Sequence, residues 1–140
     1  MKSIFKINLR YSDTDQMGVI YHANYFSFFE QGRTNFLRDV GYEYHKFEEA
    51  GIIYPVRDVQ CTYLKSIRLG EEVHVETTIH KFTRIKTTYY HEIINSDGEV
   101  KCTAYTTVVC VDKATFRPVK MDERLPEVYN AYLEVLKKDE

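Results

Sequence analysis

The sequence contains no tryptophan and few cysteines or prolines, and these shortages exclude several classes of protein. Its three cysteines, Cys61, Cys102 and Cys110, are an odd number and lack the close pairing found in zinc knuckles and redox motifs. We therefore expect reduced, buried thiols. The three prolines and six glycines form no tract that divides the chain, so we expect one domain over residues 1–140.

Long apolar runs and an excess of one charge are also missing. No apolar stretch approaches the length needed to cross a bilayer, and residues 1–6 begin an alternating pattern instead of a secretory signal. A net charge of -2 gives no field that would gather nucleic acid or an anionic membrane. We expect a cytoplasmic protein with no nucleic-acid partner and no membrane insertion.

Aromatic residues are abundant, with 12 tyrosines and 8 phenylalanines that can fill a core. Between Asn24 and Val40 apolar residues recur at three- and four-residue steps, which predicts a helix of four or more turns with a broad apolar face. Asn24 is a candidate cap, and Gly41 stands where a left-handed stop is expected. Gly32 would let another element approach this helix closely.

Most of the remaining chain alternates with a period of two, which predicts strands. The dipeptide Asp97-Gly98 predicts a hairpin, and Pro55 predicts an edge or a bulge in its strand. The order of the expected helices and strands predicts an α+β fold, in which a long central helix is wrapped by a curved antiparallel sheet of about five strands. Open sheet edges favour pairing with a second subunit, so we expect a homodimer or homotetramer. The expected strands are 4–11, 52–64, 73–79, 89–93 and 100–110, and two further helices are expected over 44–50 and 125–136.

The densest group of polar residues lies in the loop from Tyr11 to Tyr25, just before the long helix. Free backbone N–H groups and the positive end of the helix dipole gather there, so the loop could stabilise an oxyanion. A carboxylate at this place could act as general base or as nucleophile toward an activated carbonyl. The alternative is that Asp13 and Asp15 are only turn or cap residues, which is the commoner use of paired aspartates in loops.

The motif in this loop carries a resemblance to a known family. Its parts are Asp13-Thr14-Asp15, Gly18-Val19-Ile20-Tyr21-His22, Asn24-Tyr25, Glu30 and Arg33. The pattern resembles the signature of the 4-hydroxybenzoyl-CoA thioesterase family, and within it the branch associated with the Tol-Pal system. The strong match covers roughly residues 10 to 33. The resemblance implies a hotdog fold in which subunits pair through their sheets and acyl-CoA lies in a cleft between two subunits.

The resemblance also implies roles for individual residues. Asp15 matches the essential carboxylate of the family, whereas Asp13 matches a more structural position. The backbone N–H of His22 occupies the position that points at the thioester oxygen. We predict that Asp15, His22 and Tyr11 are catalytic, with no metal and no cofactor. The predicted substrate-binding residues are Gly18, Val19, Tyr21, Asn24 and Tyr25.

The expected reaction is hydrolysis of a short-chain or aromatic acyl-CoA to the free acid and CoA. Two alternatives remain: a thioesterase that acts on acyl carrier protein, and a non-catalytic module that binds acyl-CoA. The hotdog fold also serves dehydratases, whose familiar branches place a histidine and an acidic residue on or near the central helix. The helix from Asn24 to Val40 contains no histidine, so dehydration is disfavoured. Glu30 and Arg33 share a helix face at a three-residue step, so we expect a structural ion pair between them.

Overall fold

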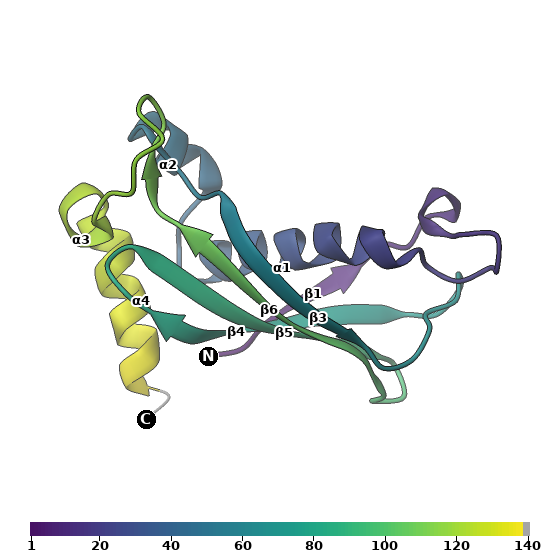
Figure 1. Cartoon of the computed structure of the whole chain (residues 1–140). Helices are drawn as coiled ribbons and strands as arrows, with labels where there is room; N and C mark the ends of the chain where they lie inside the picture. Colours follow the sequence, from purple (N-terminus) through teal and green to yellow (C-terminus); the bar gives the residue numbers. More distant parts are fainter. Residues whose placement is uncertain (139–140) are drawn as a thin grey trace.

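The main sheet of the protein has five antiparallel strands in the order β1-β4-β5-β6-β3. In this computed structural model, which describes residues 1–138, the sheet is strongly curved and helix α1 lies against one of its faces (Figure 1). The predicted α+β hotdog arrangement is therefore confirmed. The strands are β1 (Ser3–Ile7), β3 (Val56–Tyr63), β4 (Val73–Phe82), β5 (Lys86–Asn95) and β6 (Val100–Val109).

Helices and a small second sheet complete the structure. Strand β2 pairs with β7 in a separate two-stranded sheet, and α3 and α4 pack at the end of the main sheet where α2 also lies (Figure 1). No helix among the described residues is long and apolar enough to cross a membrane. These elements are η1 (Tyr11–Asp13), η2 (His22–Asn24), α1 (Tyr25–Asp39), α2 (Tyr44–Glu49), β2 (Ile52–Ile53), β7 (Val111–Asp112), α3 (Met121–Arg124) and α4 (Pro126–Lys138).

Helix α1 buries the broad apolar face that the sequence predicts. Phe29 and Phe36 are fully buried, and each such side chain contributes about 1.5–3 kcal/mol by leaving water. Gly32 lies against β4, where an added Cβ would be only 2.6 Å from the Thr77 hydroxyl oxygen. The predicted close approach at Gly32 is thus confirmed. Gly41 has a φ of 99°, which confirms the predicted left-handed stop after the helix.

A buried histidine lies beneath the middle of α1. His91 on β5 stacks on Phe29 with ring centroids 5.1 Å apart, and it hydrogen-bonds the hydroxyls of Thr77 and Thr106 at 2.9 and 2.8 Å. Burial lowers the pKa of His91 to about 3, and the positive charge of Arg33 lowers it further. The ring is therefore neutral at physiological pH and joins β4, β5 and β6 beneath the helix.

The first strand is shorter than the alternation predicts. The expected strand reaches Tyr11, but β1 ends at Ile7 and the chain turns through η1. The reason is a local hydrogen bond, because the Asp13 carboxylate accepts from the Arg10 backbone N–H at 2.9 Å and closes the turn. Tyr11 therefore stands in an exposed turn and not at the end of a strand.

The strand predicted over residues 52–64 is also interrupted. Pro55 separates β2 from β3, and β3 lies at the edge of the main sheet with a bulge between Val56 and Asp58. The predicted edge and bulge are confirmed, whereas the prediction of one continuous strand is wrong. The hairpin at Asp97-Gly98 is confirmed, and Gly98 adopts the positive φ of 84° that its turn requires.

The three cysteines are free thiols, as expected. Cys102 and Cys110 are buried and Cys61 is half-buried. Burial raises the pKa of both the Cys102 and the Cys110 thiol, which disfavours the reactive thiolate.

Candidate active site

Asp13 organises the loop that connects β1 to α1. Its carboxylate is buried and accepts from the Arg10 backbone, while its carbonyl oxygen accepts from the Tyr21 N–H and the Asn24 side-chain amide, both at 2.8 Å. The two ends of the loop are thereby tied together. Asp13 has a structural environment, as the resemblance implies for the first aspartate of the pair.

Asp15 is held in a tighter turn within the same loop. Its Oδ1 accepts from the Met17 N–H at 2.8 Å and from the Val19 N–H at 3.4 Å, and its own N–H donates to the Val19 carbonyl at 2.8 Å. The half-buried carboxylate is therefore oriented through one oxygen. Its Oδ2 takes part in no hydrogen bond with another described residue and can meet a water molecule or a substrate.

Gly18 supports this turn through its backbone conformation. It has a φ of 78°, and a Cβ added there would meet no atom within 4 Å. The turn therefore requires glycine here for its positive φ and not for close packing against another part of the chain.

A cavity of about 250 Å³ opens beside Asp15 and reaches the start of α1. Tyr63, at the end of β3, donates its hydroxyl to the His22 carbonyl at 2.8 Å and packs edge-on against the buried Tyr25. The far strand of the sheet is thus fastened to the helix start. The cavity is lined by Asp15, Met17, Val19, Ile20, His22, Tyr25, Tyr63, Leu64, Lys65 and Ser66.

Backbone donors at the helix start give the cavity an electropositive side. His22 and Ala23 open the turn η2, which leads directly into α1, and the first N–H groups of a helix lack intrahelical acceptors. Such donors stabilise a developing oxyanion. The His22 ring is exposed between Tyr21 and Tyr63, with centroid distances of 4.4 and 6.1 Å.

Burial keeps the two cavity tyrosines protonated. The pKa of Tyr25 is raised to about 12, and the pKa of Tyr63 is also raised, mainly by burial in both cases. Neither phenol is therefore a base at neutral pH. Among the described residues no cluster of His, Cys, Asp and Glu side chains could hold a metal ion.

The structure brings together only part of the predicted site. Asp15, Val19, His22 and Tyr25 line the cavity. The Tyr11 side chain is 82% exposed and lies outside the lining, because the chain has already turned through η1. Three further predicted residues that do not line the cavity are Gly18, Tyr21 and Asn24.

The predicted site residues include none from the second wall of the cavity. Tyr63 to Ser66 follow β3 and are separated from Asp15 by about a third of the chain. The sequence around these residues only weakly indicates a site, because its one unusual feature is exposed apolar side chains at a strand end, such as Leu64 at 53% exposure. Lys65 brings a positive charge to the cavity lining and forms a salt bridge with Glu99.

The expected ion pair between Glu30 and Arg33 is not formed. No salt bridge or hydrogen bond joins the two side chains, and both instead line a second cavity farther along α1. Burial lowers the pKa of Arg33, although the guanidinium stays charged, and the nearby Glu30 carboxylate partly offsets this effect.

The sequence of this chain matches the model of a known protein family. The family model described as the thioesterase-like superfamily matches residues 9–131, a span that includes both β1–α1 loop aspartates. The chain belongs to this superfamily. Membership confirms the predicted class of enzyme, a thioester hydrolase.

Individual relatives cover nearly the whole chain. It is 39% identical to the putative acyl-CoA thioesterase YneP of Bacillus subtilis over 91% of this chain and 92% of YneP. It is 29% identical to the acyl-CoA thioester hydrolase YbgC of Escherichia coli, over 80% and 84% of the respective chains. A solved DHNA-CoA thioesterase from Staphylococcus aureus superposes with a TM-score of 0.96 at 39% identity, over 99% of this chain and 93% of that one.

Proposed function

We propose that this chain is an acyl-CoA thioesterase that hydrolyses a short-chain or aromatic acyl-CoA to the free acid and CoA. The observation that carries the proposal is the Asp15 carboxylate, which two amides orient in a cavity at the start of a helix. The names of the similar proteins, acyl-CoA thioesterase and thioester hydrolase, support the same chemistry. The substrate is taken to be bound without a metal or an organic cofactor.

In the general-base route, Asp15 removes a proton from a water molecule whose oxygen attacks the thioester carbonyl carbon. Backbone N–H groups at His22 and the helix start stabilise the resulting oxyanion. The C–S bond then breaks, and the CoA thiolate takes up the proton that Asp15 holds. The exposed His22 ring, beside the same cavity, is proposed to assist by a hydrogen bond to the thioester or to Asp15.

In the nucleophilic route, the Asp15 carboxylate attacks the carbonyl carbon itself and expels the CoA thiolate. The product of this step is a mixed anhydride, which water then hydrolyses. A single turnover in ¹⁸O-water detects the nucleophilic route when water attacks the aspartyl carbonyl, whereas attack on the acyl carbonyl of the anhydride labels the released acid, as in the general-base route. Attack of water on the aspartyl carbonyl of the anhydride leaves label in Asp15, whereas the general-base route puts label only in the released acid.

The other predicted site residues receive different support. Val19 and Tyr25 are proposed to contact substrate because they line the cavity. Gly18, Tyr21 and Asn24 support the loop and the helix start, and for Tyr11 the exposed position lends no support to a catalytic role.

We further propose that the working unit is a homodimer or homotetramer built on β3. This strand is a free edge of the sheet, and unpaired edge groups invite pairing with another strand. A two-fold axis through the strand would set Val56 of one protomer opposite the partner's Tyr63. The cavity beside Asp15 would then face the second half of α1 in the partner subunit.

The test measures thiol release from a panel of short, long and aromatic acyl-CoA thioesters. Asp15→Asn keeps the size of the side chain and removes its charge, so the rate should fall by about 10²–10⁴-fold while the fold is kept. Asp97→Asn, a change in an exposed hairpin turn, is the matched control and should leave the rate unchanged. A wild type that cleaves no thioester, or an Asp15→Asn variant as active as wild type, would overturn the proposal.

The same panel decides between the remaining alternatives. Acyl groups presented on acyl carrier protein test whether the carrier is CoA, and tight acyl-CoA binding without turnover would favour the non-catalytic module. Membership of the 4-hydroxybenzoyl-CoA branch, its Tol-Pal association and a cytoplasmic location stay predictions. Preference for 4-hydroxybenzoyl-CoA over aliphatic thioesters would support the branch.

A further inference from the structure

Tyr63 reaches the start of α1 from the far strand of the sheet. It is the last residue of β3, and its hydroxyl donates to the His22 carbonyl at 2.8 Å across a sequence separation of 41 residues. The same carbonyl also accepts the Tyr25 N–H within the turn that leads into α1. A carbonyl oxygen has two lone pairs, so these two donors occupy both acceptor sites of the His22 carbonyl.

The N–H groups on either side of this carbonyl are free. Among residues 1–138, neither the His22 N–H nor the Ala23 N–H donates to another group. The Ala23 N–H belongs to the same planar peptide unit as the His22 carbonyl, so a bond that fixes the oxygen also fixes the direction of this N–H. A hydrogen bond to a carbonyl also polarises its amide and strengthens the N–H as a donor.

This geometry gives Tyr63 a role in the reaction beyond fastening β3 to the helix. Both Tyr63 and His22 line the cavity beside Asp15. We propose that Tyr63 is a positioning residue for thioester hydrolysis, because its hydroxyl holds the backbone of His22 and Ala23 in the geometry that stabilises the oxyanion. The inference rests on the proposed function, since these amides stabilise an oxyanion only if a thioester is attacked beside them. Tyr63 acts through the His22 backbone and needs no contact with the substrate.

The Tyr63 ring is held in place without its hydroxyl. It packs edge-on against the buried Tyr25, with ring centroids 4.9 Å apart. The next two residues, Leu64 and Lys65, donate their N–H groups to the Lys101 carbonyl on β6 at 2.9 and 3.0 Å. Tyr63→Phe should therefore keep the ring and the cavity wall where they are and remove only the bond to His22.

The Tyr63 hydroxyl remains a hydrogen-bond donor over the whole pH range of an assay. Burial raises the pKa of Tyr63, and the nearby Cys61 thiol raises it further. A fall in activity at high pH therefore does not come from loss of this proton.

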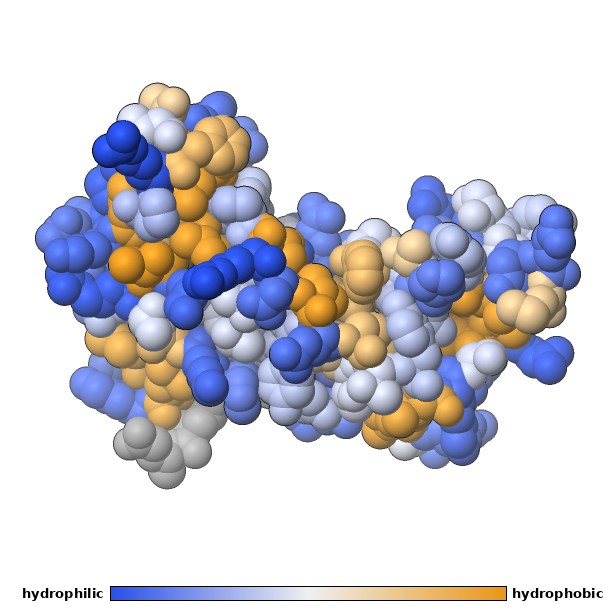
Figure 2. All heavy atoms as spheres, in the orientation of Figure 1, coloured by the Kyte–Doolittle hydropathy of each residue, from blue (hydrophilic) through white to orange (hydrophobic). Residues whose placement is uncertain are grey.

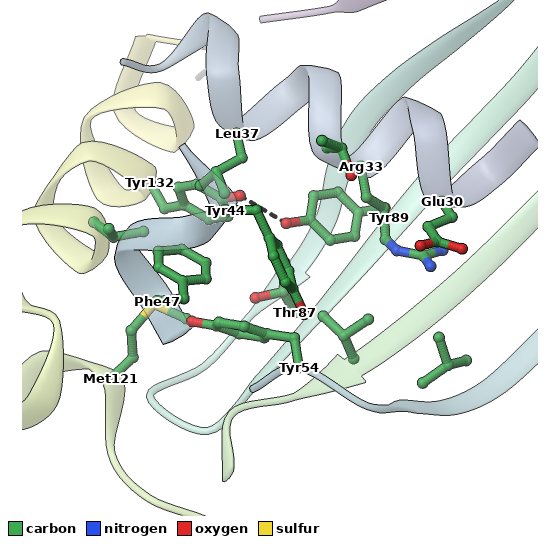
Figure 3. Close-up of a pocket in the computed structure, with 14 residues that line it drawn as sticks. Glu30, Arg33, Leu37, Tyr44, Phe47, Tyr54, Thr87, Tyr89, Met121 and Tyr132 are labelled. Atoms are coloured by element: carbon green, nitrogen blue, oxygen red, sulfur yellow. Dashed lines mark hydrogen bonds between the residues drawn. The ribbon is translucent and has the colours of Figure 1, made fainter. Parts of the chain in front are cut away.

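The hydroxyls of Tyr89 and Tyr132 form a hydrogen bond of the ordinary structural kind. They lie at the end of the molecule that carries α2 and α4, where apolar residues gather (Figure 2). Both side chains are buried, and Figure 3 shows their 2.7 Å bond, which joins β5 to α4. Removing one hydroxyl would leave the other buried without its partner, at a cost in stability.

The bond from Tyr63 differs in its exposure. Tyr63 is 42% exposed, and the His22 carbonyl keeps the Tyr25 N–H when the hydroxyl is removed. Water can therefore replace the hydroxyl, and stability should hardly change. An effect of Tyr63→Phe on the reaction can thus be told apart from an effect on folding.

The experiment measures kcat and KM of wild type and Tyr63→Phe on the thioester of the panel that wild type cleaves fastest. In Tyr63→Phe, kcat should fall about three- to tenfold, the effect of one neutral hydrogen bond, and KM should change by less than about twofold. The matched control is Tyr105→Phe, which removes a hydroxyl from a ring that packs against His80 outside this cavity. It should leave both constants unchanged.

Melting temperatures accompany these measurements. Tyr132→Phe should lower the melting temperature by at least about 2 °C, and Tyr63→Phe by clearly less. An unchanged kcat in Tyr63→Phe, whether or not its melting temperature falls, would overturn the inference and leave thioester hydrolysis in place. A wild type that cleaves no thioester would overturn the proposed function and the inference with it.

An infrared measurement tests the positioning directly. The same acyl-CoA, labelled with ¹³C at the thioester carbonyl, is bound to Asp15→Asn protein, and its carbonyl stretching frequency is recorded. Hydrogen bonds from the amides polarise the carbonyl and lower this frequency. Adding Tyr63→Phe should raise the frequency, whereas adding Tyr105→Phe should not. An identical frequency with and without Tyr63→Phe would overturn the inference, because a purely structural hydroxyl would not change the bound carbonyl.

Discussion

The two cavities, one at the start of α1 and one along its second half, are built in opposite ways. The cavity beside Asp15 depends on loop backbone: amides orient the carboxylate, and a positive φ at Gly18 allows the turn. The second cavity depends on side chains from helices and strands, and the Thr87 hydroxyl in it has no hydrogen-bond partner among residues 1–138. The Asp15 carboxylate is thus held by backbone hydrogen bonds close to a helix start, whereas the walls of the second cavity are side chains held by helices and the sheet.

The structure between the two cavities keeps them apart within one protomer. Phe29 stacks on the buried His91, and Gly32 lets α1 lie directly on β4. The core divides at this place into one cluster near the Asp15 end and another near α2 and α4. In the proposed β3 dimer, a substrate that contacts both cavities therefore draws them from two protomers.

Mixed oligomers test that conclusion with the largest expected effect. Asp15→Asn chains carry an intact second cavity, and Thr34→Trp chains, in which a ring added on α1 fills that cavity, carry an intact Asp15. Co-expressed and purified through two different tags, the mixture should recover between about a quarter and a half of wild-type activity on the acyl-CoA that wild type cleaves best. Each variant alone should stay at least about tenfold below wild type.

If both cavities of one active site came from the same protomer, mixing would restore nothing. The control is a mixture of Asp15→Asn with Asp15→Asn under the two tags, which should remain inactive. Activity in that control would mean that the assay detects a contaminating hydrolase.

The pH dependence of the free energy of unfolding tests the role of His91, which is buried beneath α1. Folded His91 has a pKa of about 3 and the unfolded chain titrates near 6.5, so below pH 6.5 the unfolded chain binds a proton that the folded one does not. Stability is therefore lost as pH falls from 6.5 toward 3, by about 1.4 kcal/mol per pH unit for this group. Urea titrations at several pH values measure the slope.

His91→Gln should flatten that slope, whatever its cost at neutral pH. His45→Gln, at an exposed position in α2, should keep it. An identical slope in wild type and His91→Gln would mean that other groups govern the acid sensitivity.

The contact between α1 and β4 gives the smallest expected effect. Gly32→Ala places a Cβ 2.6 Å from the Thr77 hydroxyl oxygen, and such overpacking should lower the free energy of unfolding by about 1–3 kcal/mol. Combining it with Thr77→Ala removes the clashing oxygen. The double variant should therefore lose less stability than the sum of the single changes, and strict additivity would contradict the clash.

Local pattern predicted most of the elements of this fold. The periodicity between Asn24 and Val40 predicted α1, and Gly32 and Gly41 indicated its close contact and its end. The pattern failed where one hydrogen bond outweighed alternation, as at Asp13, whose carboxylate ends the first strand early. It also failed at Pro55, where one predicted strand became parts of two sheets.

The candidate site was predictable only where it is continuous in sequence. Asp15 and His22 belong to one loop, so residue types and spacing indicated them. Tyr63 reaches the same cavity from β3, and nothing local to it indicates that its hydroxyl meets the His22 carbonyl. The helical spacing of Glu30 and Arg33 predicted an ion pair, but the cavity wall holds the two side chains without one.

By itself the sequence determined the class of fold, the long helix and the polar loop before it, because these follow from periodicity and from neighbouring residues. Only the tertiary structure decided which distant residues form the second wall of the site and which buried hydroxyls stay unpartnered. The physical reason is that hydrogen-bond satisfaction and cavity shape depend on residues from several strands meeting in space. The pairing of strands in the sheet brings these distant residues into contact, and no local sequence pattern specifies which strands pair.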